Sequence, residues 1–288
     1  TAEKPSLGFW VTVSSGVTNM ILDAVLVMQL PQEYKLAGAA IATAVSQLVG
    51  GAIPLIYFFR ENNTILRLGK TSFEGSAVLK ACTNGSSEFM SNISMSLVGM
   101  LYNMQLMKYA GENGIAAYGV MMYVSMIFAG AFIGYSVGTA PVVSYHFGAG
   151  NHKELKSLLQ KSLRIILIFS LSMAASAELL ARPLAQIFVS YDAELMALTV
   201  SGFHIFALSF LFMGFAIYGS GFFTALNDGL TSALISFLRT LVFQIAAVLL
   251  LPLIFKINGV WISIVVAECM ALLLTFVFLI RKRTKYHY

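Results

Sequence analysis

Four acidic residues stand inside long apolar stretches of this sequence: Asp23, Glu88, Glu178 and Glu268. If such a stretch crosses a membrane, a carboxylate at its centre costs at least about 2.5–3.5 kcal/mol on insertion scales. An acid kept at that cost is a candidate for binding an ion, a proton or a substrate, or for a buried ion pair.

Asn19 and Asp23 are four residues apart, so both side chains project from one face of a helix. An amide carbonyl and a carboxylate are hard oxygen ligands that suit a sodium-like ion, and burial also favours a carboxylate that accepts a proton. Thr43 offers a hydroxyl oxygen from the antiparallel neighbouring stretch. The sequence predicts a coupling-ion site for Na+ or H+ at Asn19, Asp23 and Thr43. The alternative is a structural polar pair that ties two helices together.

Glu88 begins a second polar stripe, which Ser91, Asn92 and Met95 continue at helical spacing. In a low-dielectric cleft a carboxylate attracts an organic cation, and it releases that cation when it takes up a proton. We therefore expect Glu88 and Asn92 to bind the substrate or the proton. The alternative is that the small residues of this stripe serve tight helix packing.

The remaining charged residues of the apolar stretches favour structural roles. Glu268 lies deep in the last stretch and Arg239 enters the preceding one from the same side, so we expect a structural ion pair. Glu178 is expected near the outer end of its stretch, in contact with solvent. His204 is expected to be a packing residue on an apolar face. The sequence has no cysteine–histidine cluster, so we expect no metal site apart from the possible Na+ site.

The elements that must position these residues are membrane-spanning helices. Of the 288 residues, 58% are hydrophobic and 11% are charged, whereas an average soluble domain has about 25% charged residues. The two cysteines, Cys82 and Cys269, are expected to be packed thiols. A helix needs about 20 apolar residues to cross the hydrocarbon core. An all-α membrane protein with eight transmembrane helices is predicted, at residues 8–30, 36–59, 77–108, 115–145, 157–180, 196–224, 231–255 and 259–280.

Lysine and arginine predict the orientation of these spans. With the first span starting in the cytosol, fourteen of the eighteen basic residues fall on the inner side. Only Lys35, Lys108, Arg182 and Lys256 fall outside. Because inner loops carry the excess of positive charge, we expect a multi-pass protein of the inner (plasma) membrane with both termini cytosolic.

An ungapped internal repeat indicates a two-lobe organisation. Residues 19–60 overlay residues 240–281, so that Pro31 falls on Pro252, and Gly38 falls on Gly259. The second copy closes a run of six spans and the first a run of only two, which predicts a fragment of a twelve-helix transporter with parallel repeats. The expected domains are a helical hairpin at 1–60, a cytosolic inter-lobe linker at 61–76 and a C-terminal six-helix lobe at 77–288.

Several segments resemble the multidrug and toxic compound extrusion (MATE) antiporters. Residues 114–118 and 140–151, with Gly134 and Gly138 between them, resemble the eighth span of that family. Residues 19–23 and 38–43 look like its fifth and sixth spans, and 227–228 with 236–239 fit its tenth-to-eleventh connection. The chain departs from the family pattern by lacking spans one to four and an acid in the middle of the tenth span.

The resemblance implies a cation-coupled antiporter, driven by Na+ or H+, that exports drug-like or organic cationic compounds by alternating access. It would act as a monomer in the lipid bilayer, without a cofactor or nucleic acid. No P-loop is present, so an enzyme that hydrolyses nucleotide is not expected. Two alternatives stay open: a flippase for lipid-linked saccharides from the related superfamily, and a non-functional truncated membrane protein.

Overall fold

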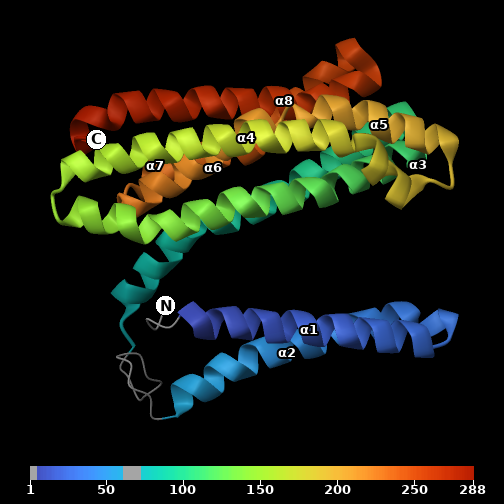
Figure 1. Ribbon diagram of the computed structural model, residues 1–288, viewed down its shortest axis with the longest axis horizontal. Helices are drawn as coiled ribbons and strands as arrows, with labels where there is room; N and C mark the ends of the chain where they lie inside the picture. The colour runs from blue at the N-terminus through green and yellow to red at the C-terminus, as the bar shows by residue number, and fades with distance from the viewer. Residues whose placement is uncertain (1–4, 61–72) are drawn as a thin grey trace. The chain divides into compact units, whose positions relative to one another are not determined.

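The computed structural model describes the backbone of residues 5–60 and 73–288, with side chains outside positions 5, 77, 80–81 and 83–91. Within these ranges the chain is almost entirely helical and contains no strand (Figure 1). It divides into two compact units, Thr1–Glu74 and Gly75–Tyr288. The first unit holds α1 (Pro5–Gln29), the short 3-10 helix η1 (Gln32–Tyr34) and α2 (Lys35–Phe59).

The first unit is a hairpin of two antiparallel helices closed by small residues. Gly38, Ala42 and Ser46 recur every four residues and are the buried positions of α2. A Cβ on Gly38 would lie 2.7 Å from Leu30 Cδ1 and 3.2 Å from Leu26 Cβ, so a larger residue would require these leucines to shift. The Ser15 hydroxyl donates a hydrogen bond to the Ser46 carbonyl, at 2.8 Å. Such small-residue contacts are typical of helix pairs in membranes.

The second unit is a helical bundle. Its elements are α3 (Gly75–Gly148), α4 (His152–Val189), α5 (Ala193–Ala207), α6 (Phe210–Ala225), α7 (Gly229–Phe237), the π-helix η2 (Leu238–Phe243) and α8 (Gln244–Tyr286). The first turns of α3 extend beyond the bundle in Figure 1. For this reason Cys82 is exposed and not packed, whereas Cys269 is partly buried.

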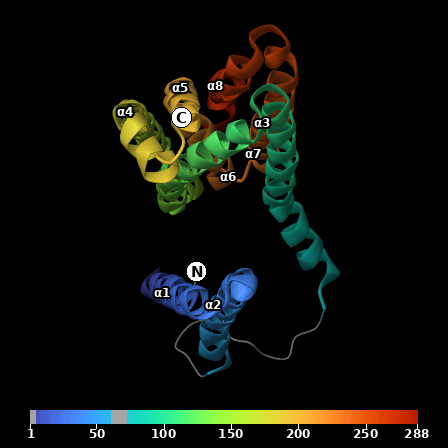
Figure 2. The same ribbon diagram turned by 90° about the vertical axis from the view of Figure 1, so that its right-hand side faces the viewer.

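Both α3 and α8 turn back on themselves, as Figure 2 shows for α3. Gly111 (φ 61°) interrupts α3 and Lys256 (φ 53°) interrupts α8. The rings of Tyr102 and Tyr118 stack with centroids 5.1 Å apart, although sixteen residues of straight helix span about 24 Å. The Ser263 hydroxyl likewise donates to the Ala247 carbonyl at 3.0 Å, across Lys256. Each label therefore covers two antiparallel helices.

Five helices of the described residues are long and apolar enough to cross a membrane. The bent pair α5 and α6, at 49°, makes a sixth if it counts as one span. Two of the five, Asn92–Gly148 and Gly229–Tyr286, contain the turning points at Gly111 and Lys256. The described residues therefore have the helices of a multi-pass membrane protein.

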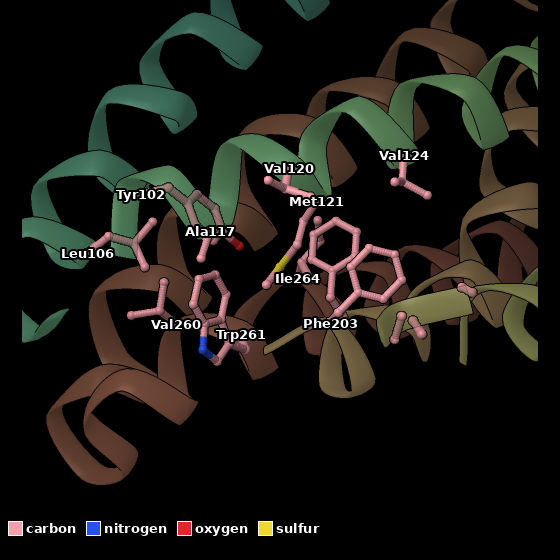
Figure 3. Close-up of a cluster of buried hydrophobic side chains, with 14 of the residues drawn as sticks. Tyr102, Leu106, Ala117, Val120, Met121, Val124, Phe203, Val260, Trp261 and Ile264 are labelled. Atoms are coloured by element: carbon pink, nitrogen blue, oxygen red, sulfur yellow. The ribbon is translucent and has the colours of Figure 1, made fainter. Parts of the chain in front are cut away.

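The core of the second unit lies where these helices cross, and Figure 3 shows part of it. Tyr102, Phe203 and Trp261 are among its largest fully buried side chains. A Cβ on Gly202 would come within 2.6 Å of Met121 Cε and 2.8 Å of Trp261 Cε2. The missing side chain at Gly202 thus lets α5 approach both α3 and α8. This packing holds the polar residues described below in fixed positions.

Asp228 joins the turn between α6 and α7 to the end of α8. Its carboxylate accepts hydrogen bonds from the Thr231 backbone N–H (3.2 Å), the Thr231 hydroxyl (2.8 Å) and the Tyr286 hydroxyl (2.8 Å). Lys282 Nζ lies 3.3 Å from the same carboxylate. Burial alone would raise the pKa of Asp228, but the four donors outweigh it and lower the pKa to about 2.

This arrangement predicts an acid-sensitive stability. Because the folded-state pKa of Asp228 lies below the ordinary 3.8, its contribution is present above about pH 4 and is lost as the pH falls towards 2. Asp228→Asn should lower the free energy of unfolding by about 2 kcal/mol at pH 7. The measurement is unfolding in detergent between pH 7 and pH 2.

Asp192→Asn is the matched control. Asp192 also caps a helix, accepting from Glu194 N at 2.8 Å and Leu195 N at 3.1 Å, and asparagine caps a helix about as well as aspartate. This substitution should cost only a few tenths of a kcal/mol. Equal losses for both variants, or a loss for Asp228→Asn that does not shrink in acid, would contradict the assignment.

Candidate functional site

A charged pair lies in the interior of the second unit. Arg239 Nε donates to both oxygens of Glu268, at 3.1 Å to Oε1 and 2.8 Å to Oε2. The Glu268 side chain is 3% exposed and that of Arg239 is 17% exposed. The two residues expected to pair from sequence are thus in direct contact. A buried pair of this kind holds its helices in one register, because separating the charges is costly.

The π-helix η2 carries the arginine of this pair. Its six residues, Leu238–Phe243, run between α7 and α8 without a break in the chain. A π-helix hydrogen-bonds every fifth residue, which widens the turn and changes where the side chains point, and such turns are frequent at functional sites. The sequence offers no proline or glycine at this position to mark it.

A tyrosine and a glutamine extend the polar interior. The Tyr102 hydroxyl donates to Gln244 Oε1 at 2.8 Å, and both side chains are buried. Glu268 is close enough to Tyr102 to interact with it electrostatically. Gln244 occupies the position of Asp23 in the internal repeat, and no sequence pattern indicated its link to Tyr102. The tyrosine is on α3, so the network joins α3, η2 and α8.

A chain of hydroxyl groups links α6 and α7. Ser220 Oγ lies 2.9 Å from Ser232 Oγ and 2.8 Å from Ser236 Oγ. Thr224 Oγ1 is 2.7 Å from Ser232 Oγ. Ser236 precedes Arg239 by three residues on the same helical stretch. Connected hydroxyls of this kind can donate and accept in turn, so they suit the relay of a proton.

The residues predicted to bind substrate lie in the first half of α3. Glu88 is in this helix, but its side chain is outside the described residues. Asn92 is exposed, and so is Met95, at 61%. The role of Glu88 and Asn92 stays a prediction.

The residues predicted to bind the coupling ion lie in the hairpin of the first unit. Asn19 and Asp23 are partly buried on α1. Thr43 is exposed on α2, and its hydroxyl donates to the Ala39 carbonyl of its own helix at 3.0 Å. The contact between the helices runs through Ser15 and Ser46 instead. An ion at Asp23 would have to draw the Thr43 hydroxyl away from Ala39, and the ion site stays a prediction.

His204 differs from what the sequence suggested. His204 Nδ1 lies 2.7 Å from Glu178 Oε1, with side chains 46% and 51% exposed. His204 is therefore a polar partner and not a packing residue, whereas Glu178 is half exposed, in agreement with the expected contact with solvent. α4 continues to Val189, beyond the span end expected at residue 180. Glu178 consequently lies eleven residues inside its helix, level with His204.

A multi-pass helical bundle with a buried ion pair in its interior has the architecture of a membrane transporter. The chain belongs to the MatE family, whose model matches residues 89–250. It is similar to the multidrug export protein MepA of Staphylococcus haemolyticus, with 25% identity over 97% of this chain and 61% of the relative. MepA of Staphylococcus aureus NCTC 8325 is 23% identical over 92% of this chain and 58% of its own length.

Solved structures of membrane transporters share the fold. MATE in complex with MaL6 has a TM-score of 0.84 and 22% identity, over 96% of this chain and 63% of the other. A MOP superfamily transporter from Pyrococcus furiosus has a TM-score of 0.85 and 21% identity, over 97% and 63%. The chain spans about three fifths of the length of the MepA relatives.

Proposed function

We propose that this chain is part of a cation-coupled antiporter that exports drug-like or organic cationic compounds by alternating access. The observation that carries the proposal is the buried network of Arg239, Glu268, Tyr102 and Gln244, in a chain of the MatE family. The relatives that this chain resembles are named as multidrug export proteins, which supports a role in export. Polar groups kept inside a membrane bundle mark ion and substrate pathways.

The proposed architecture is a six-helix lobe at 77–288, a linker at 61–76, and a hairpin at 1–60 that belongs to a second lobe. The turns at Gly111 and Lys256 support eight spans, because each divides one long helical segment into two. Each of the two hairpins also has an equivalent close approach between its own helices. Gly38 approaches Leu30, and Gly259, its repeat partner, would place a Cβ 2.4 Å from the Leu251 carbonyl oxygen. Leu251 is the repeat partner of Leu30, which supports a parallel repeat.

Asp23, with Asn19 and Thr43, is proposed to bind the coupling ion, Na+ or H+. The repeat supports this role, since Gln244 occupies the position equivalent to Asp23 and bonds to Tyr102 in the interior of its own unit. By the same geometry Asp23 would face the interior of the first lobe. A carboxylate there replaces a neutral amide, which gives this lobe a group that can bind a cation or a proton.

Glu88 and Asn92 are proposed to receive the substrate. Glu88→Gln should reduce export of an organic cation about tenfold and leave export of a neutral compound of similar size within about twofold, because only the cation gains from a carboxylate in low dielectric. The measurement compares ethidium with a neutral dye in vesicles that contain the complete transporter. Equal losses for the two dyes would leave Glu88 a packing residue.

The proposed function is tested by measuring whether transport depends on an ion gradient. Vesicles with the complete transporter, in the orientation with both termini cytosolic, should move ethidium only while an Na+ or H+ gradient is present. Separate collapse of each gradient, with an ionophore for one ion at a time, identifies the coupling ion. Transport that continues after both gradients are collapsed would refute the antiporter.

A further inference from the structure

A groove lies at one end of the second unit, between α4 and the C-terminal part of α8. Its volume is about 310 Å³, at the lower limit of common small-molecule pockets. The walls include Leu159, Leu163 and Leu279, and Lys156, Arg283 and Tyr288 also line it. All are residues of the second unit, and none belongs to the polar network described above.

The groove has an apolar floor and a basic rim. Leu159 and Leu279 are 7% and 6% exposed and form part of the core at this end of the unit. Lys156 is exposed near the start of α4, and Arg283 is exposed near the end of α8. Because the groove is lined by leucines and by the cations Lys156 and Arg283, it suits a ligand with an apolar tail and an anionic head.

The Arg283 side chain at the rim is held in place by Tyr288. Arg283 Nε donates to the Tyr288 backbone carbonyl at 3.1 Å, and the Tyr288 hydroxyl donates to the Leu279 carbonyl at 3.1 Å. This bond uses Nε, and the terminal amino groups of Arg283 make no hydrogen bond to the described residues. A guanidinium held in this way presents a fork of N–H donors that matches phosphate oxygens.

The residues around the groove indicate that it lies at the boundary between the acyl chains and the lipid head groups. Ile280 at its edge is 72% exposed, and Leu273 and Val277 continue the same face of α8 at 61% and 44% exposed. Exposed apolar side chains along a spanning helix face acyl chains. Beyond the groove, basic residues concentrate at the same helix ends: Lys153, Lys161, Arg281, Lys282 and Lys285. The nearby acids are Glu154, which is exposed, and Asp228, which already bonds to Lys282.

We propose that this groove binds one anionic phospholipid of the cytoplasmic leaflet, with an acyl chain against Leu159 and Leu163 and the phosphate between Lys156 and Arg283. Basic pockets between spanning helices on the cytoplasmic side are where anionic head groups bind. The lipid would bridge the first helix turns of α4 to the last turns of α8. It would therefore brace the end of the bundle at which Asp228 also joins two helices.

The test is lipid binding to the purified complete transporter, measured by native mass spectrometry. Dioleoyl phosphatidylglycerol should bind more tightly than dioleoyl phosphatidylcholine, and glycerol phosphate without acyl chains should not compete. Lys156→Gln should weaken phosphatidylglycerol binding about fivefold, the contribution of one cation near a lipid head group. Lys153→Gln removes the same charge from the same helix end outside the groove and should change the affinity less than about twofold.

A second variant tests the apolar floor without a change of charge. Leu163→Trp fills the groove and should weaken binding of phosphatidylglycerol while unfolding in pure detergent stays unchanged. Equal effects of Lys156→Gln and Lys153→Gln would indicate a diffuse basic belt and overturn the site. No preference for phosphatidylglycerol would overturn it as well. Because lipid binding is measured without transport, either result leaves the proposed antiporter untouched.

Discussion

Glu268→Gln will lower the free energy of unfolding of the second unit by about 3–5 kcal/mol, the cost of leaving one member of a buried ion pair without its partner. Glu268 is 3% exposed and accepts both hydrogen bonds from Arg239 Nε. The amide keeps the size of the side chain but removes the charge, so the guanidinium stays in the interior unpaired. The loss is measured by equilibrium unfolding of the purified protein in detergent.

Two further variants separate the ion pair from simple packing. Replacing both residues with hydrophobic ones, Arg239→Met with Glu268→Leu, should restore most of the stability, because no buried charge remains. Glu178→Gln is the control at a half-exposed pair and should cost less than about 1 kcal/mol. If Glu268→Gln costs no more than Glu178→Gln, or if the double replacement is as unstable as the single one, the pair does not support the bundle.

Much of the helical architecture could be predicted from the sequence, because helix length and apolar composition are properties of each segment alone. The stretch expected at 36–59 corresponds closely to α2, Lys35–Phe59. The breaks expected between spans, at 109–114 and 256–258, contain the turning points at Gly111 and Lys256. What could not be predicted is the backbone conformation of the turns. Gly111 and Lys256 each reverse the chain through a single residue of positive φ. At Lys256 no glycine marks the conformation, and its strain is supported by the packed hairpin, which no local pattern reveals.

Only the charged part of the polar network could be predicted from the sequence. Arg239 and Glu268 are charged residues in apolar stretches, and burial leaves them few options besides each other. Tyr102 and Gln244 carry no charge and are 142 residues apart. A tyrosine packs as readily as it hydrogen-bonds, so its partner is decided by tertiary contacts. The π-helix that carries Arg239 was unpredictable for the same reason.

Asp23→Asn in the complete transporter will reduce ion-driven export on the order of 100-fold, near the upper limit of typical coupling energies between two ligands. The substitution removes the negative charge and the proton-binding group and changes the shape of the side chain little. Asp23 has no hydrogen bond or ion pair to the described residues, so the hairpin should fold normally. Export of ethidium under an Na+ or H+ gradient is the readout, with the amount of folded protein measured in parallel.

The controls for Asp23→Asn come from the same hairpin. Thr43→Val removes the proposed third ligand, and the wild-type hydroxyl bonds only to Ala39 of its own helix. Thr12→Val removes a hydroxyl that bonds in the same way to Gly8 and lies outside the proposed site.

If Na+ is the coupling ion, Thr43→Val should raise the Na+ concentration needed for half-maximal export about tenfold, because one oxygen ligand is lost, and Thr12→Val should leave it unchanged. If H+ is the coupling ion, neither threonine should matter and only Asp23→Asn should stop export. Normal export by Asp23→Asn under either gradient would show that the hairpin carboxylate does not couple ion movement to export.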